Sequence, residues 1–260
     1  MRSFVTEHYE ADLSGKPYSA NVPEKIAVVS DLHNTLHGTR NEKLLEAIRS
    51  EQPDVIVIPG DLVTNASKKN RVAYTFLKDL SELGMPVYYG VGNHEEKFRK
   101  RDPERFEKYL EAVKKLGIIY LDNAFAEYSD GVFFGGLTIP FDCYKKGPQM
   151  HRLTIRDVHN CIPNVPDGLR FVMCHNPVWF PVYEEGGFDV VFSGHVHGGI
   201  IRLPFFGGLI SPQWKLFPKY DAGKFAIGNS LMFVSRGLGS HTIRLRFRNK
   251  PELMIVHCKK

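Results

Sequence analysis

Five short clusters of polar residues are spread along the chain, and each follows a run of apolar, β-prone residues. In an α/β sheet, ligands collect at the carboxyl ends of the strands. If these five strand ends lie side by side, they bring two Asp, one Asn and four or five His residues together, which is a ligand set for two divalent metals. The clusters are Asp31-Leu32-His33, Gly60-Asp61, Gly92-Asn93-His94-Glu95, His175 and Gly194-His195-Val196-His197.

The first half of the chain alternates predicted strands with predicted amphipathic helices. Apolar residues recur at helical spacing over residues 41–49, 72–83 and 103–116. Strands that alternate with helices of this length imply βαβ crossovers and largely parallel strands. The predicted strands of this half are residues 25–30, 54–59 and 86–91.

From residue 118 onward the chain is predicted to be mostly β, with one more helix over residues 150–161. We find no internal repeat, linker or low-complexity segment, so residues 1–260 are expected to form a single domain. The simplest architecture is α/β, with two packed sheets flanked by helices and the polar loops at one edge. The predicted strands here are residues 118–121, 125–128, 132–137, 170–174, 188–193, 224–227, 231–235, 242–248 and 252–257.

Composition narrows the class of protein. With 43% hydrophobic and 24% charged residues, the chain can build a large core. Its formal charge of +5 suits anionic substrates such as phosphate esters, but it also suits a merely soluble surface. The four cysteines match no zinc or disulfide pattern, so free thiols in a reducing compartment are expected.

No targeting or membrane signal is visible. No apolar run approaches the ~18 residues that a membrane-spanning helix needs, and the first ten residues do not resemble a signal peptide. The chain as given is therefore expected to be cytoplasmic. Membrane association stays open, because a native anchor could be missing from this sequence.

The ligand types in the clusters point to a particular chemistry. Mn²⁺, Fe²⁺ and Zn²⁺ accept carboxylate, amide oxygen and imidazole ligands together. Two such ions about 3.5–4 Å apart need a shared ligand, and a carboxylate serves well. The pair generates hydroxide at neutral pH and clamps a phosphate in line with it. No nucleophilic side chain is then required.

In order and context, the motifs D-x-H, G-D, G-N-H-E, H and G-H-x-H resemble those of the calcineurin-like metallophosphoesterase superfamily. The resemblance implies a four-layer α/β/β/α sandwich, which agrees with the predicted elements. Flanking residues resemble a bacterial phosphodiesterase branch whose members are often membrane-anchored or exported. The second motif reads Gly60-Asp61-Leu62-Val63-Thr64-Asn65. Protein Ser/Thr phosphatases have an Asp-Arg-Gly in this motif, and the missing Arg counts against that group.

The resemblance also implies a role for each motif residue. Asp31, His33 and His197 should bind the first metal, and Asp61 should bridge the two ions. The second metal should be bound by Asn93, His175 and His195, with Asn93 using its amide oxygen. His94 should be no ligand but should contact the phosphate and protonate the leaving oxygen, a general-acid role that suits imidazole.

Other polar residues are interpreted as structural. His37 lies four residues after His33, but its loop context counts against chelation. Glu95 is expected to start or cap a helix, and Cys174 is expected to be a core thiol. The remaining histidines are expected to form ordinary hydrogen bonds: His8, His151, His159, His241 and His257.

Residues 203–218 are aromatic and rich in Pro and Gly, and they follow the last cluster directly. They are neither a good helix nor a good strand. One interpretation is a packed loop that covers a sheet edge. The other is an apolar wall or lid beside the site, suited to a substrate with an apolar group.

Three functions are compatible with these motifs to different degrees. The favoured function is a dinuclear metal-dependent phosphodiesterase or pyrophosphohydrolase that uses a metal-bound hydroxide, and a lipid-linked phosphate ester is one candidate substrate. The alternatives are a phosphomonoesterase and a catalytically silent scaffold that binds protein partners.

A nuclease ranks low because the sequence has no basic groove with interleaved aromatic residues, so no nucleic acid is expected as a partner. The oligomeric state is left open.

Overall fold

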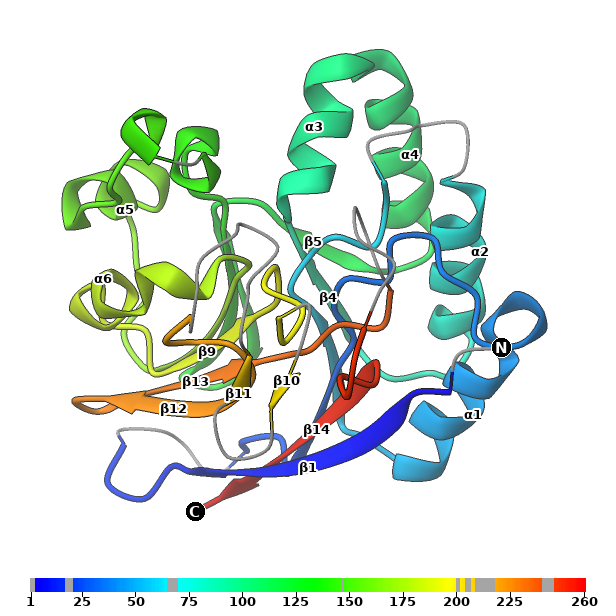
Figure 1. Ribbon diagram of the computed structural model, residues 1–260. Helices are drawn as coiled ribbons and strands as arrows, with labels where there is room; N and C mark the ends of the chain where they lie inside the picture. Colours follow the sequence, from blue (N-terminus) through cyan, green and yellow to red (C-terminus); the bar gives the residue numbers. More distant parts are fainter. Residues whose placement is uncertain are drawn as a thin grey trace.

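The computed structural model describes residues 3–16, 21–64, 70–145, 147–199, 202–203, 207–208, 218–239 and 246–260. Within these ranges, two six-stranded sheets pack against each other, and helices cover the outer face of each sheet (Figure 1). Among the helices described, none is long and apolar enough to cross a membrane. Most of the predicted strand 242–248 and most of segment 203–218 lie outside the described residues.

The first sheet is mixed. Strands β2 to β5 run parallel, while β14 is antiparallel to β2 and parallel to the edge strand β1. In spatial order the strands are β1 (Val5–Asp12), β14 (Glu252–Lys259), β2 (Lys25–Val28), β3 (Val55–Ile58), β4 (Val87–Gly90) and β5 (Ile119–Leu121).

Four α-helices belong to this sheet, and their amphipathic faces explain their positions. Buried residues such as Phe76 and Leu80 of α2 pack onto the sheet in one apolar cluster. Helix α4 begins at Pro103, and its N-cap Asp102 accepts a hydrogen bond from the backbone N–H of Arg105. The helices are α1 (Glu42–Glu51, after the 3₁₀ turn η1, Thr39–Asn41), α2 (Arg71–Ser81), α3 (Asn93–Arg101) and α4 (Pro103–Lys115).

The second sheet is also mixed, with parallel inner strands and an antiparallel strand at each edge. Its outer face is covered by the short helices α5 (Ile155–Cys161) and α6 (Phe180–Glu185). In spatial order its strands are β12 (Gly223–Ile227), β13 (Ser230–Val234), β9 (Val190–Ser193), β8 (Leu169–Cys174), β7 (Val132–Leu137) and β6 (Ala124–Ser129). Smaller elements are the 3₁₀ turns η3 (Phe141–Tyr144), η4 (Gly147–Gln149) and η5 (Pro177–Trp179) and the strand pair β10 (Arg202–Leu203) and β11 (Gly207–Gly208).

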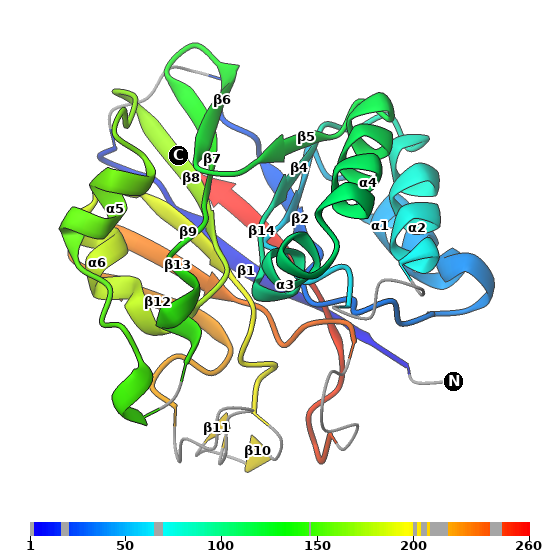
Figure 2. The ribbon, with the colours of Figure 1, turned by 90° about the horizontal axis from the view of Figure 1, so that it is seen from above.

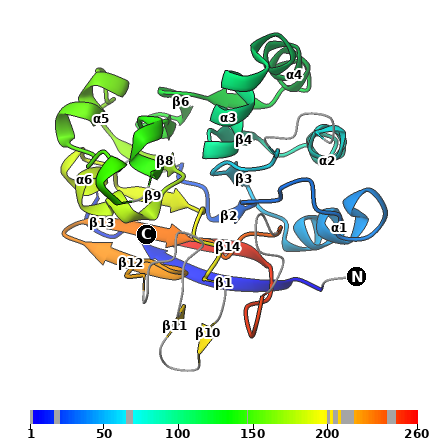
Figure 3. The ribbon, with the colours of Figure 1, turned by 45° about the horizontal axis from the view of Figure 1, so that its top comes forward.

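Three apolar clusters separate the four layers. One lies between the first sheet and α1 to α4, one between the two sheets, and one between the second sheet and α5 and α6. Across the middle cluster, Tyr88 of the first sheet stacks on Phe134 of the second with ring centroids 4.4 Å apart. Figure 3 shows the helices on opposite sides of the sandwich. The expected α/β/β/α architecture is therefore confirmed.

Most predicted elements are present, but three differences have physical causes. The helix expected over residues 150–161 begins only at Ile155, because Thr154 and Asp157 form a capping box that starts it there. Strand β1 was not predicted, since its sequence is largely polar and its pairing partner β14 lies at the other end of the chain. Helix α6 was also missed, because six residues are too few to show a clear period.

Candidate metal centre

All five polar clusters come together where β2, β3, β4, β8 and β9 end. Asp31 and His33 follow β2, Asp61 follows β3, and Asn93 and His94 are the first two residues of α3 after β4. His175 follows β8 directly, and β9 leads to the remaining pair, His195 and His197. Helix α3 stands at the junction of the two sheets (Figure 2). Parallel strands end at the same edge of a sheet, so their loops meet there.

The side chains form two adjoining groups. In the first, His197 Nε2 lies 3.5 Å from Asp31 Oδ1 and 3.3 Å from His33 Nε2. In the second, Asp61 Oδ2 lies 3.2 Å from His175 Nε2, and His195 completes the group, with ligand atoms within 4.8 Å of one another. Asp61 Oδ2 is also only 3.8 Å from His33 Nε2, so this carboxylate stands between the two groups.

Two residues of the third motif adjoin these groups. Asn93 is buried, and its amide oxygen has no hydrogen-bond partner among the described residues. Such a group costs roughly 1–3 kcal/mol unless something binds it, and a cation would satisfy it. His94 donates a 2.8 Å hydrogen bond from its backbone N–H to Asp61 Oδ1. Its ring lies close enough to His33 and Asp61 to form a third possible ligand group.

Opposite charges are concentrated in this buried site. Burial raises the pKa of Asp31 to about 6. Burial alone would also raise the pKa of Asp61, but the nearby His175 and His94 hold it well below its usual value. For His175, burial lowers the pKa, and the charge of Asp61 more than compensates and raises it to about 9. Burial and the charge of His175 lower the pKa of His195 to about 3.

The backbone at the site is strained. Asp31, His33, Asp61, His195 and His197 all have φ between 47° and 67°, the left-handed region that residues with a Cβ rarely adopt. Each such residue costs on the order of 1–3 kcal/mol, and such strain collects at functional sites. The strained turns place all five side chains within one small volume.

Two glycines allow the backbone to approach the carboxylates closely. A Cβ on Gly92 would lie 2.2 Å from Asp61 Oδ1, and one on Gly194 would lie 2.1 Å from Asp31 Oδ2. Neither contact is possible without displacing a carboxylate. The glycines in G-N-H-E and G-H-x-H are therefore required by packing against the acidic residues.

Glu95 caps α3, as expected from the sequence, and it also binds the loop after β3. Its carboxylate accepts hydrogen bonds from the backbone N–H groups of Asp61, Leu62 and Gly92 at 2.8, 3.0 and 3.0 Å. Burial and the neighbouring Asp61 raise its pKa to about 7. Glu95 thus ties the loop after β3 to the start of α3.

Among the described residues, none of those interpreted as structural belongs to a possible ligand group. His37 is buried, with Nε2 3.0 Å from the carbonyl oxygen of Leu238. His8 and His257 stack on each other across β1 and β14, and His151 contacts Asp157. All four cysteines are free, and Cys174 is buried in the core beneath α6. His159 is exposed on α5, and His241 lies outside the described residues.

Three residues near the site were not found from the sequence because they belong to no motif. The Arg246 guanidinium lies 3.2 Å from His197 Nδ1. The Tyr144 ring packs edge-on against His195 with centroids 5.1 Å apart. Lys97 follows His94 by three residues on α3. No motif includes any of them. Lys97 lies one helical turn beyond His94, whereas only the folded chain brings Arg246 and Tyr144 to the site.

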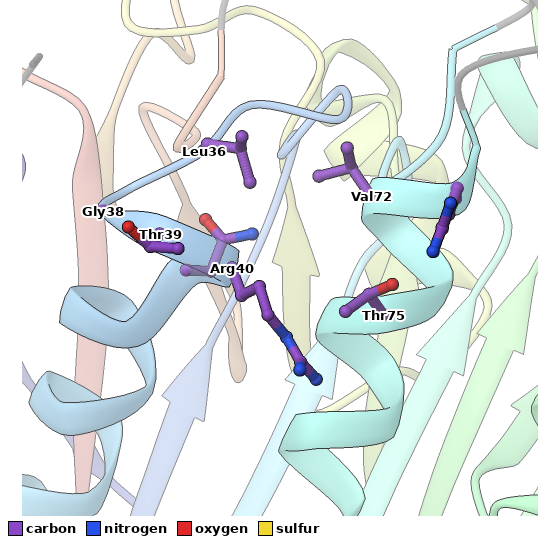
Figure 4. A pocket seen from close by; sticks show the side chains of 8 residues that line it. Leu36, Gly38, Thr39, Arg40, Val72 and Thr75 are labelled. Atoms are coloured by element: carbon purple, nitrogen blue, oxygen red, sulfur yellow. The ribbon is translucent and has the colours of Figure 1, made fainter.

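A separate hollow of about 490 Å³ opens between η1 and α2. Figure 4 shows Leu36 and Val72 on its walls, together with Thr75 and Arg40. Arg40 is already paired with Asp79 at 2.6 Å. None of the residues that line the hollow is among the eight predicted site residues, so we do not assign it to the metal centre.

Known proteins with similar sequences include three bacterial ones. The chain is 30% identical to the uncharacterized protein YpbG of Bacillus subtilis over 94% of this chain and 82% of that protein. It is 27% identical to phosphodiesterase YaeI of Escherichia coli (90% and 82%). It is 25% identical to UDP-2,3-diacylglucosamine pyrophosphatase LpxG of Chlamydia trachomatis (90% and 83%).

A solved structure with a similar fold is the sulfate thiohydrolase SoxB of Thermus thermophilus. It shares 11% sequence identity with this chain at a TM-score of 0.50, covering 82% of this chain and 52% of that one. This likeness concerns the fold alone. The family model of the calcineurin-like phosphoesterases matches residues 24–199, a stretch that contains all eight predicted site residues. With these motifs, this fold and this match, the chain belongs to the calcineurin-like phosphoesterase family.

Proposed function

We propose that this chain is a dinuclear metal-dependent phosphoesterase that hydrolyses phosphodiesters or pyrophosphates. Metallophosphoesterases use divalent metal ions, and the chain carries candidate ligand residues for them. One observation carries the proposal: Asp61 Oδ2 lies 3.2 Å from His175 Nε2 and 3.8 Å from His33 Nε2, between the two groups. A carboxylate in this position is suited to be shared by two ions.

The ligand assignment follows the two groups. Asp31, His33 and His197 would hold one ion, and Asn93, His175 and His195 the other, with Asp61 shared. This mixture of carboxylate, amide oxygen and imidazole suits Mn²⁺, Fe²⁺ or Zn²⁺. When bound, the two ions would supply the positive charge that polarises the phosphate and acidifies a water molecule. The unpartnered Asn93 oxygen supports this assignment.

We assign His94 to the substrate rather than to a metal. Its backbone N–H is anchored on Asp61, and its ring lies edge-on to His33 with centroids 4.8 Å apart. An imidazole held beside the phosphate can donate a hydrogen bond to it and pass a proton to the leaving oxygen. His94 would therefore act as the general acid.

The substrate class rests on the relatives and on charge. YaeI is named a phosphodiesterase and LpxG a pyrophosphatase of a diacylated nucleotide sugar, so diesters and diphosphates, including lipid-linked ones, are the substrates that we propose. The formal charge of +5 suits such anions. We further propose that residues 1–260 work as one metallophosphoesterase domain, since β1 and β14 from opposite ends of the chain pair within the first sheet.

The test is metal-dependent hydrolysis of model esters by protein purified without chelator. Bis-p-nitrophenyl phosphate should be hydrolysed faster than p-nitrophenyl phosphate, the activity should vanish with EDTA, and Mn²⁺ should restore it. Full activity in the metal-free protein would contradict the dinuclear mechanism. Bound metals with no turnover of any ester would favour a catalytically silent scaffold instead, and a preference for the monoester would favour a phosphomonoesterase.

A further inference from the structure

Lys97 lies beside the candidate metal centre, one helical turn beyond His94. Residues three apart on a helix share a face, and they are separated by about 4.5 Å along its axis. Burial lowers the pKa of Lys97, while the charge of Asp61 raises it. The charge of Lys97 also helps to lower the pKa of His195. Lys97 therefore lies on the same part of α3 as His94, beside the candidate metal centre.

This lysine differs from Arg99 and Lys100 on the same helix. Arg99 pairs with Glu96 and Asp122, and Lys100 pairs with Glu96. In the part of the chain that the structure describes, no carboxylate oxygen lies within 4 Å of Lys97 Nζ. The Lys97 side chain is only partly exposed, and a half-buried cation without a counter-ion is unfavourable unless a ligand supplies the opposite charge.

An aromatic ring lies beside the Lys97 ammonium group. Its Nζ lies 5.8 Å from the centroid of the Phe141 ring in η3, within cation–π range. The same turn carries Tyr144, whose ring packs against His195. Lys97 thus stands between α3 and η3 at the rim of the site, and an aromatic ring stabilises the ammonium group there without neutralising its charge.

We propose that Lys97 binds a second anionic group of the substrate, one phosphate away from the phosphate that is hydrolysed. This inference rests on the proposed function and deepens it. His94 and the metal ligands would compensate the charge on the attacked phosphate. A diphosphate diester carries a second charged phosphate next to the attacked one, and a simple diester does not. A cation one turn farther along α3 would therefore meet a second charge only in the diphosphate. An ammonium group is a good partner for phosphate oxygens, so this residue selects diphosphate diesters over simple phosphodiesters.

Calorimetry on metal-loaded protein tests whether Lys97 binds a second anionic group, without relying on turnover. The probes are methylenediphosphonate, which carries two phosphorus groups and resists hydrolysis, and inorganic phosphate, which carries one. Lys97→Met should weaken binding of methylenediphosphonate roughly tenfold or more, the range for a lost charge-assisted hydrogen bond, and binding of phosphate by less than about twofold. Lys97→Arg should restore most of the affinity.

Lys100→Met is the matched control. This substitution removes the same charge from the same helix. Lys100 Nζ also lies 4.4 Å from the centroid of the Phe141 ring, but Lys100 is largely exposed and paired with Glu96. Lys100→Met should change neither the affinity for methylenediphosphonate nor the affinity for phosphate. Equal losses for both probes in Lys97→Met would place the lysine at the attacked phosphate and overturn the inference, as would no loss at all. Melting curves for each variant check that the fold is intact.

Kinetics separate this inference from the proposed function. In Lys97→Met, KM for a diphosphate diester such as UDP-glucose should rise roughly tenfold with little change in kcat, while bis-p-nitrophenyl phosphate is spared. If the wild-type protein with Mn²⁺ hydrolyses no ester, the proposed function fails. The calorimetric comparison of the two probes still decides whether Lys97 binds a second anionic group.

Discussion

The carboxylate of Glu95 accepts a 2.8 Å hydrogen bond from the backbone N–H of Asp61, the residue that stands between the two ligand groups. It also accepts hydrogen bonds from the N–H groups of Leu62 and Gly92 and from the Tyr89 hydroxyl at 2.7 Å. One buried side chain therefore sets the position of the loop after β3 relative to α3. The placement of the Asp61 carboxylate depends on this support.

Replacing Glu95 by Gln should damage both stability and metal binding. The amide NH₂ would face backbone donors in place of a carboxylate oxygen, and each donor left unsatisfied costs roughly 1–3 kcal/mol. We expect a loss of about 3 kcal/mol in urea unfolding, together with lower metal content by elemental analysis. Glu96→Gln is the control, because the described residues that pair with Glu96 are Arg99 and Lys100 of the same helix. Equal effects of the two substitutions would argue against the supporting role of Glu95.

Asp61→Asn should lower metal occupancy at both sites, because the shared negative charge is removed. Elemental analysis of wild-type protein should find about two transition-metal ions per chain, as the dinuclear assignment requires. The variant should hold less than one. His37→Asn is a suitable comparison, since His37 is buried, its Nε2 lies 3.0 Å from the Leu238 carbonyl oxygen, and it belongs to no possible ligand group among the described residues. An Asp61→Asn protein that keeps both ions would exclude Asp61 as the bridge.

His94→Asn should leave metal occupancy intact and cut turnover by ~10²–10⁴, the range for a positioned general acid. The loss should shrink for esters with good leaving groups such as p-nitrophenolate, which need little protonation. The measurement compares kcat for an aryl and an alkyl diester. Because the His94 ring lies near His33 and Asp61, the competing role is that of a ligand. Loss of a metal ion in this variant would establish that role instead.

Gly92→Ala should displace the Asp61 carboxylate, because the added Cβ would lie 2.2 Å from its Oδ1 and 2.5 Å from its backbone nitrogen. We expect lower metal content and at least a tenfold loss of kcat/KM, since small displacements in an active site can cost roughly 10²-fold. Gly186→Ala is the control, because its added Cβ would have no neighbour closer than 3.3 Å. Full activity in Gly92→Ala would show that the loop can rearrange without consequence.

Much of the fold could be predicted from local patterns. The buried strands β2, β3 and β4 are continuous apolar runs, and α1, α2 and α4 have apolar residues at helical spacing. The elements that were missed or mispredicted lack such a pattern. Strand β1 is half-exposed and polar, and only its pairing with β14 makes it a strand. The start of α5 was set by the Thr154 capping box rather than by the apolar period.

The candidate ligands could be predicted from residue types and their positions, because metal-ligand chemistry restricts residue types and the apolar runs show where strands end. The surroundings of these ligands depend on how the chain folds. Glu95 became the support of Asp61, Arg246 became a neighbour of His197, and Lys97 came to lie against Phe141 beside the metal centre. These contacts join residues from different strands, helices and turns. No periodicity or motif encodes them, because they depend on how two sheets and their helices pack across the whole chain.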